Sequence, residues 1–576
     1  MPAEVRRTSG RDAFPAFVLG AVLIASIAIL ATLAIVLWTS FLDGPLGVVI
    51  GRFTLKNYAS VLNDSQTYDV IRDTLAFAAM ATAVPLILGI PIAWLYERTD
   101  LPGKSLLFFA MTIGIIVPGF AVAMGWLFLL DPRIGILNTF LQESFGLADA
   151  PFNIVSLVGM GWVQGLSLTP VAFIMTAAVF RAMDPALEEA AQMAGARPGR
   201  IFAAITAPLA WPGILAASIY IFTIGFAAFD VPAIIGWSNR LFTFATFLFL
   251  LVNPQSVLPR YGVAAALSTV VLFLAVLLSW WYARMQQRAR KYAVVTGKAY
   301  RPRAVALGRV KTLLSWGFIA IYLAVSLLVP IALLVWSSIL PYFQLPSVQA
   351  FRSVSLDHYY RLPWQLMATG FWNTGALMLL TPTVTVILSL CFSWLVLRSR
   401  VPGRPVFDFI AFLPHAVPSI IFGVGAFLFA IYVIQAVLPI YGTIWILLFV
   451  FVIARVSFGT RMTNSGLIQI HPDIEEAAQV AGARGFGIAR QILVPMLRPT
   501  LVYVWLWTAL LTFRELTLAV IVSTPKNLTL PVVIWSQWSG GDIGMASSIV
   551  VVMLLVMSVL IALYWLVAGR RGLLSA

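Results

Sequence analysis

A ten-residue stretch occurs twice in this chain of 576 residues: residues 188–197 read EEAAQMAGAR, and residues 475–484 read EEAAQVAGAR. The wider segments 185–212 and 472–499 align without gaps and are identical at 14 of 28 positions. Both copies lie in polar loops between long apolar segments. Because a loop has no buried core of its own to fill, we infer that a partner outside the apolar segments contacts this stretch twice.

Each copy has the features of a short surface helix. Asp184 is placed to cap the first helix, and Asp473 with Glu476 resembles a capping box at the start of the second. Each helix should run for about ten residues and end at a glycine, Gly195 or Gly482, which suits left-handed backbone. The alanines between these ends would form a smooth strip that a partner can approach closely. The alternative is a pair of ordinary interfacial helices that tie neighbouring spans together.

The repeat extends beyond this loop. Residues 93–103, AWLYERTDLPG, recur 300 positions later at residues 393–403 as SWLVLRSRVPG. Pro118 and Gly125 recur at the same offset as Pro418 and Gly425, whereas the offset at the loops is 287. The sequence therefore predicts two homologous halves. These are residues 1–283 with their loop at 181–208, a basic linker at 284–312, and residues 313–576 with their loop at 460–498.

The composition excludes a water-soluble protein. Apolar residues make up 61% of the chain and charged residues only 10%, whereas a soluble chain has about 25% charged residues. The apolar segments are continuous rather than alternating and long enough to cross a bilayer as helices, which excludes a β-barrel. We expect an all-α polytopic membrane protein with about twelve transmembrane helices, six in each half. The predicted spans cover residues 14–41, 74–95, 105–130, 153–180, 209–236, 258–283, 313–340, 373–397, 405–432, 438–459, 499–525 and 545–568.

The charges orient these spans. The loops on one side carry 26 Lys and Arg against 11 Asp and Glu, whereas the other side carries nine of each. The positive-inside rule places the basic side, with both termini and the linker 284–312, in the cytoplasm. The net charge of +15 therefore reflects topology, and we expect no nucleic-acid partner. The linker could also bind a partner or anionic lipid head groups.

The sequence lacks the residues for chemistry of its own. One cysteine, Cys391, and three histidines leave no metal-ligand spacing. The segment Thr296–Ala299, TGKA, lacks the first glycine and the hydroxyl of a nucleotide-binding P-loop. We therefore expect no catalytic residue, no metal site and no cofactor bound by this chain.

A longer pattern surrounds each repeated stretch: Glu-Ala-Ala, three residues, Gly, nine residues, Ile, two residues and Pro, at residues 189–208 and 476–495. This pattern resembles the signature of binding-protein-dependent ABC transporter permeases, although the usual Leu before the Pro is Ala207 or Val494 here. The resemblance covers nearly the whole chain and is to the fused, two-domain permeases of ferric-iron, thiamine and phosphonate importers. The segments FTLKNY at 53–58, AWLYERTDLPG at 93–103 and LPHAVP at 413–418 look most like the ferric-iron branch.

The resemblance implies the fold of a type I ABC importer permease in a bacterial inner membrane. Each loop helix would sit in a groove of one of two P-loop ATPase subunits, which hold ATP and Mg, while a periplasmic binding protein delivers the substrate. The expected ATPase-coupling residues are Glu188, Glu189, Ala190, Ala191, Gly195, Arg197, Pro208, Glu475, Glu476, Ala477, Ala478, Gly482, Arg484 and Pro495.

Charges within predicted spans give a second set of candidates. A charge at the bilayer centre costs about 2.5–3.5 kcal/mol on insertion scales, so each suggests a function. Asp230, Arg514, Glu515 and His415 are candidates for the translocation path; the alternative is that they tie helices together. Arg514 and Glu515 are neighbours on one predicted helix and point about 100° apart, so they should face different partners. Arg455 is expected to extend toward the membrane surface.

Ferric iron is the expected substrate, because of the resemblance and because the acidic Asp230 and Glu515 suit a hard cation. Arg514 would equally suit an anion, so a phosphonate such as 2-aminoethylphosphonate is the nearest alternative, followed by thiamine and a polyamine. A secondary transporter also commonly has twelve spans and an internal repeat. A membrane-embedded enzyme would need clustered His and carboxylate side chains in the spans.

Overall fold

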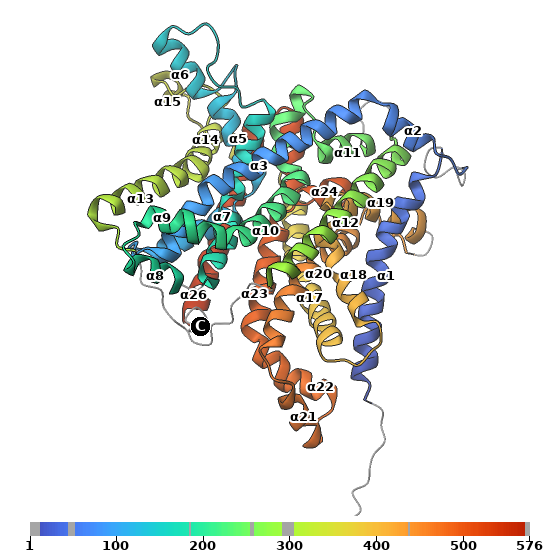
Figure 1. The fold of residues 1–576 in the computed structure, drawn as a ribbon. Helices are drawn as coiled ribbons and strands as arrows, with labels where there is room; N and C mark the ends of the chain where they lie inside the picture. The colour runs from blue at the N-terminus through green and yellow to red at the C-terminus, as the bar shows by residue number, and fades with distance from the viewer. Residues whose placement is uncertain are drawn as a thin grey trace, which may run out of the picture. The chain divides into compact units, whose positions relative to one another are not determined.

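The computed structural model describes residues 12–43, 52–183, 186–253, 258–290, 305–435 and 438–570. The predicted cap Asp184 and residues 291–304 of the basic linker lie outside these ranges. The described part of the chain is built from helices, with two isolated β-bridges and no extended strand (Figure 1). This confirms the predicted all-α fold.

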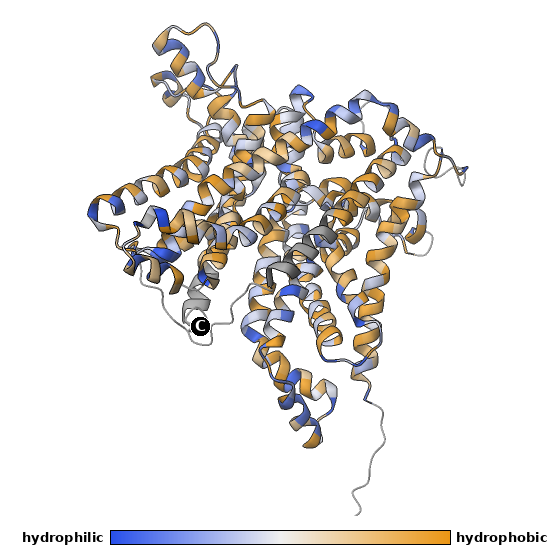
Figure 2. Cartoon of the chain, viewed as in Figure 1, coloured by the Kyte–Doolittle hydropathy of each residue, from blue (hydrophilic) through white to orange (hydrophobic). Residues whose placement is uncertain are grey.

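Nine helical segments in the described residues are long and apolar enough to cross a membrane by themselves, and the number rises to twelve if each of three bent helix pairs is one span. Apolar residues run along these helices, and polar residues gather near their ends (Figure 2). The long segments are α1 (Phe14–Ser40), α3 (Ser65–Arg98), α7 (Leu157–Ala182), α9–α10 (Gly199–Phe226), α13–α14 (Gly308–Ser338), α17 (Trp364–Leu397), α20 (Ile444–Ile468), α22–α23 (Gly485–Phe513) and α26 (Ile543–Ala562 of Ile543–Arg570).

Two of the bent pairs occur at equivalent positions of the repeat. Helices α4 (Lys104–Ile116) and α5 (Gly119–Leu130) meet at 91°, and α18 (Arg404–Ala416) meets α19 (Ser419–Phe429) and its continuation at 105°. The residue before each repeated proline is extended, because proline disfavours helical backbone at the position that precedes it. Each of the spans predicted at 105–130 and 405–432 is therefore broken into two helices at its repeated proline.

The third bent pair lies where the sequence predicts an outer loop. Residues Pro232–Asn239 and α11 (Phe244–Val252) form a pair bent by 67°. Thr243 and Thr246 form a capping box at the start of α11, and the amide of Phe244 donates to Thr74 Oγ1 at 2.7 Å. This nine-residue apolar run is too short for a span and was missed for that reason. The predicted span at 258–283 corresponds to α12 (Tyr261–Arg290).

The signature prolines coincide with a repeated irregularity. Each of α10 (Ala207–Phe226) and α23 (Val494–Phe513) follows a turn of π-helix, η1 (Phe202–Thr206) or η6 (Ala489–Leu493), 287 positions apart. A proline inside a helix has no N–H to donate and collides with the carbonyl four residues earlier. Widening the preceding turn by one residue relieves both problems. The Ile-to-Pro part of the signature thus has a structural meaning.

Packing divides the chain into two compact units that cut across the sequence halves. The first unit comprises residues 1–38, 371–527 and 567–576, and the second comprises 39–370 and 528–566. In the first unit, α1 packs on α19 so closely that a Cβ on Gly425 would lie 2.5 Å from the Thr32 carbonyl. In the second, a Cβ on Gly125 of α5 would lie 2.5 Å from Pro330 of α14. The first span of each half therefore packs with helices of the other half.

The remaining described helices are short; η4 lies inside the span formed by α13 and α14, and the others lie in loops or beside the breaks. They are α2 (Lys56–Asn63), α6 (Ile136–Phe145), α8 (Ala186–Met193), η2 (Pro232–Gly236), η3 (Trp237–Asn239), η4 (Ala324–Leu328), α15 (Val348–Arg352), α16 (Asp357–Tyr360), η5 (Ala430–Ile434), α21 (Pro472–Val480), α24 (Thr517–Val522) and α25 (Leu530–Ser539).

Candidate coupling loops and intramembrane charges

The repeated stretch forms a short helix in both halves, α8 and α21 (Figure 1). Helix α21 begins at Pro472, and its N-cap is His471, whose Nδ1 accepts a hydrogen bond from the Asp473 amide at 3.4 Å. The predicted capping box of Asp473 and Glu476 is therefore wrong. Asp473 lies inside the first turn, where a carboxylate still interacts favourably with the helix dipole.

Both helices end as the sequence predicts. Gly195 has φ of +81° and Gly482 has φ of +88°, the left-handed conformation that favours glycine. After each glycine, an amide donates to a carbonyl five residues earlier, as in a Schellman motif. The two bonds are Ala196 N–H to Ala191 O at 3.0 Å and Ala483 N–H to Ala478 O at 2.9 Å.

Near its C-terminal end, each helix exposes apolar side chains, one large and one small. Met193 is 85% exposed and Val480 is 90% exposed, at equivalent positions of the two helices. Ala190 and Ala477, one turn earlier, are also exposed. These large side chains are mostly exposed beside small ones, and another protein can cover such a surface.

The first glutamate of each pair is turned inward rather than outward. In the second loop, Arg398 Nε donates to Glu475 Oε1 at 2.6 Å, with the two side chains only 12% and 10% exposed. Arg398 Nη2 also donates to the carbonyls of Leu467, at 3.0 Å, and Ile470. Arg398 follows the last residue of α17, so one side chain joins the ends of α17 and α20 to α21.

The first loop brings the equivalent residues together less tightly. Arg98, the last residue of α3, is buried, and its Nη1 lies 3.6 Å from Glu188 Oε2 on α8. Its Nη2 donates to the Met183 carbonyl at 3.3 Å. Glu188 Oε1 also accepts from Thr206 Oγ1 at 2.7 Å. Sequence reasoning assigned no role to Arg98 or Arg398, although both belong to the repeated segments 93–103 and 393–403.

The other predicted coupling residues lie around these helices. Glu189 is half-buried, whereas Glu476, Arg197 and Arg484 are exposed. Ala191 and Ala478 are half-buried in the last turns. The signature prolines, Pro208 and Pro495, are exposed in the first turns of α10 and α23.

The intramembrane charges sit where helices break. Helix α23 ends at Phe513, and α24 begins at Thr517, so Arg514 and Glu515 are not on one continuous helix. Glu515 pairs with Arg455 of α20, and its Oε1 accepts from the Leu518 amide at 3.2 Å. Arg455 was expected to extend toward the membrane surface, and the structure gives it an acidic partner that the sequence did not predict.

Asp230 and His415 also lie at breaks. Asp230 lies between α10 and η2, and its Oδ2 is 3.4 Å from the position that a Cβ on Gly119 would take. It therefore faces the junction of α4 and α5. His415 lies in the last turn of α18, exposed, with its ring 5.5 Å from that of Phe412. Asp230 belongs to the second unit and the other candidates to the first, so a shared path stays a prediction.

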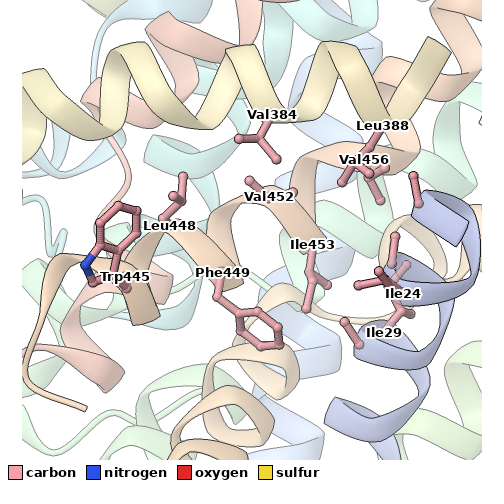
Figure 3. Close-up of a pocket in the computed structure, with 13 residues that line it drawn as sticks. Ile24, Ile29, Val384, Leu388, Trp445, Leu448, Phe449, Val452, Ile453 and Val456 are labelled. Carbon is pink, nitrogen blue, oxygen red and sulfur yellow. The ribbon is translucent and has the colours of Figure 1, made fainter. Parts of the chain in front are cut away.

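Two further observations concern binding. Among the residues that the structure describes, no three His, Cys, Asp or Glu side chains are grouped to hold a metal ion. A cavity of about 390 Å³ lies within the first unit between α1, α17 and α20 (Figure 3). Its lining is apolar, from Ile24 and Val384 to Phe449 and Ile453, so it offers a hydrophilic substrate no ligand.

Comparison with known proteins identifies the chain's relatives. The family described as binding-protein-dependent transport system inner membrane component matches residues 86–291. The chain is similar to the ferric transport system permease protein FbpB of Actinobacillus pleuropneumoniae, at 23% identity over 90% of this chain and 74% of that protein. It is 30% identical to the inner membrane ABC transporter permease protein YdcU of Escherichia coli, over 38% of this chain and 74% of that protein.

The spermidine/putrescine transport system permease protein PotB of Salmonella typhimurium is 28% identical over 40% of this chain and 80% of that protein. Membership of the permease family excludes the secondary transporter and the membrane enzyme considered from the sequence. The chain belongs to the binding-protein-dependent transport system inner membrane components, as a fused, multi-span permease subunit of an ABC importer.

Proposed function

We propose that this chain is the membrane path of an ATP-driven importer of ferric iron. The observation that carries the proposal is the extent of the likeness to the ferric permease of Actinobacillus pleuropneumoniae, which runs through both halves and covers 90% of this chain. The polyamine permease covers only 40% of it. A relative that matches both halves supports a shared path more strongly than one that matches a single half.

The coupling loops support the proposed partners. Two P-loop ATPase subunits bind one at α8 and one at α21, hold ATP and Mg, and hydrolyse ATP, because this sequence contains no P-loop of its own. Two helices of eight and nine described residues, with the same ending and an exposed apolar tip, suit two copies of one partner. A periplasmic binding protein delivers the substrate at the opposite face.

The charge distribution supports the proposed topology. Residues 1–283 and 313–576 form the two permease halves in a bacterial inner membrane, with both termini and the linker 284–312 in the cytoplasm. The excess of basic residues lies on that side. This orientation also puts both coupling loops in the cytoplasm, where ATP is available.

The candidate path residues can pass a cation without trapping it. Glu515 is already engaged by Arg455 and by the Leu518 amide, so its carboxylate is a weak ligand for an incoming ion. Asp230 at the α4–α5 junction supplies a second carboxylate. Hard cations prefer such oxygen ligands, and a path requires contacts weak enough to release them. His415 and Arg514 complete the proposed set.

The test is uptake of labelled substrates by cells with and without the gene. Under iron starvation, and with other iron importers removed, deletion should abolish uptake of labelled ferric iron. Uptake of labelled 2-aminoethylphosphonate, thiamine and putrescine should be unchanged. Unchanged iron uptake, or loss of one of the other uptakes, would contradict the iron assignment while leaving the permease family intact.

A further inference from the structure

We propose that Arg98 and Arg398 are the positioning residues that lock each coupling helix to the core spans, so that helix and spans move as one body. Each guanidinium would carry the displacement of its coupling helix directly to the end of α3 or α17. The proposal rests on the proposed function in assuming that an ATPase moves α8 and α21. The lock itself, meaning the contacts of Arg98 with α8 and of Arg398 with α21, involves residues of this chain alone.

The second loop shows the lock most clearly. The Arg398 side chain donates to the Glu475 carboxylate of α21 and to two carbonyls. One belongs to Leu467 in the last turn of α20, and the other to Ile470, two residues after that helix. Its own backbone continues directly from α17. Charge-assisted hydrogen bonds are shorter and stronger than neutral ones, and the planar guanidinium fixes their directions. Three structural elements are therefore held at one point.

The first loop supplies an independent observation of the equivalent ion pair, at the longer distance of 3.6 Å. Arg98 lies 300 positions before Arg398, and it approaches Glu188, 287 positions before Glu475. Its bond to the Met183 carbonyl matches the bond of Arg398 to Ile470, again 287 positions apart. Because the arginine and its partners come from segments with different offsets, two copies of one contact were retained across an insertion between them.

The chemistry of the pair favours positioning over simple stabilisation. A buried ion pair contributes little net stability compared with apolar side chains of similar volume. The second loop already has apolar packing, through Leu467, Ile470 and Ile488. What an arginine adds to such a contact is direction, because its bonds resist rotation and sliding of the helix in a way that apolar contacts do not.

The functional test measures substrate uptake per ATP hydrolysed. The full chain is reconstituted in liposomes with its ATPase subunits and binding protein, as the parent and as Arg398→Met, Arg98→Met and both together. Uptake per ATP should fall about tenfold or more in each variant, the change expected from one charge-assisted bond. The exposed Arg400→Met is the matched control and should keep the parent ratio.

A charge exchange separates positioning from folding. Arg398→Glu combined with Glu475→Arg restores the pair in reverse and should recover part of the uptake-to-hydrolysis ratio lost by Arg398→Glu alone. If Arg398→Met keeps the parent ratio, or if the exchange recovers none of it, the lock is not a positioning device.

A distance measurement tests the lock without any partner. Spin labels are attached at Val480→Cys on α21 and Arg400→Cys after α17, in a Cys391→Ser background. Pulsed electron paramagnetic resonance on the chain alone should give one narrow distance distribution, which Arg398→Met broadens. Equal widths would overturn the inference whatever the partners are. A parent chain that shows the narrow distribution but never drives uptake with any ATPase would instead overturn the proposed function.

Discussion

The two coupling loops share a sequence and a helix ending, but they hold their first glutamate differently. In the first loop, Glu188 lies 3.6 Å from Arg98 and accepts a hydrogen bond from Thr206. In the second, Arg398 donates directly to Glu475 at 2.6 Å. The position equivalent to Thr206 is Leu493, which has no hydroxyl to compete for the carboxylate. A residue outside the repeated stretch, Thr206 or Leu493, thus determines how closely the first glutamate approaches its arginine.

The second loop is also braced from the N-terminus. Asp12 Oδ2 accepts from the Gly485 amide at 2.7 Å, and the Phe14 ring packs edge-on against Trp394 and Phe486. A Cβ on Gly485 would lie 2.6 Å from the Phe14 Cβ, so this approach requires glycine. The first loop has Pro198 at the equivalent position, and proline has no amide hydrogen to donate. We infer that the second loop is the more rigidly held.

The largest effect is expected from the helix-ending glycines, where the two loops agree. A residue with a Cβ at positive φ costs roughly 1–2 kcal/mol, and a β-branched side chain would also shift the end of the helix against its partner. Gly195→Val and Gly482→Val should each abolish uptake while the protein still inserts. ATP-driven uptake in proteoliposomes is the measurement. Normal ATPase association and substrate-stimulated hydrolysis in both variants would refute docking at these helices.

The next largest effect is a loss of stability that should differ between the two loops. Glu475→Gln leaves Arg398 buried beside a neutral amide and should destabilise the chain by up to about 3 kcal/mol. Glu188→Gln should cost less, because the longer pair in the first loop loses less electrostatic energy and the amide can still bond Thr206. Thermal unfolding of both variants in detergent measures this difference. Equal losses of stability in the two variants would show that Thr206 does not weaken the contact between Glu188 and Arg98.

A smaller loss of stability should follow from exchanging Thr206 and Leu493, the residues that distinguish the two arginine–glutamate contacts. Thr206→Val removes one hydrogen bond to the charged Glu188 carboxylate, worth about 1.5–3 kcal/mol. The freed carboxylate can then turn toward Arg98, so part of this loss should be recovered. Leu493→Thr makes the reverse change in the second loop. Melting temperatures that fall more for Thr206→Val than for Glu188→Gln would contradict the proposed competition.

The smallest effect should come from removing the contact between Asp12 and the second loop. Asp12→Ala removes the acceptor for the Gly485 amide and should cost about 0.5–1.5 kcal/mol. Hydrogen exchange at Gly485 and Phe486 should become faster, while exchange in α8 should be unchanged. Faster exchange in both loops would mean that Asp12 acts on the whole fold rather than on the second loop.

The sequence was most informative where a pattern is local. The repeated glycines specified both helix ends, because positive φ is a property of single residues. The prolines around His415 predicted a kink there, but the break at Pro118 was missed, since a hydropathy window records apolarity and not backbone direction. The ties of Arg98 and Arg398 were missed because their partners lie in a different segment of each half. Which apolar helices α1 contacts could not be predicted either, because apolar surfaces of similar composition do not specify a partner.

We propose that both repeated helices, α8 and α21, are docking points for ATPase subunits. Met193→Cys and Val480→Cys, made in a Cys391→Ser background, place one thiol at each exposed helix tip, with Tyr360→Cys in the predicted outer segment as control. Site-specific cross-linking in membranes that contain the cognate ATPase should join it to residue 193 and to residue 480. The double variant should capture two ATPase subunits, and the control none. An importer that transports normally yet cross-links at neither tip, or at only one, would contradict the account.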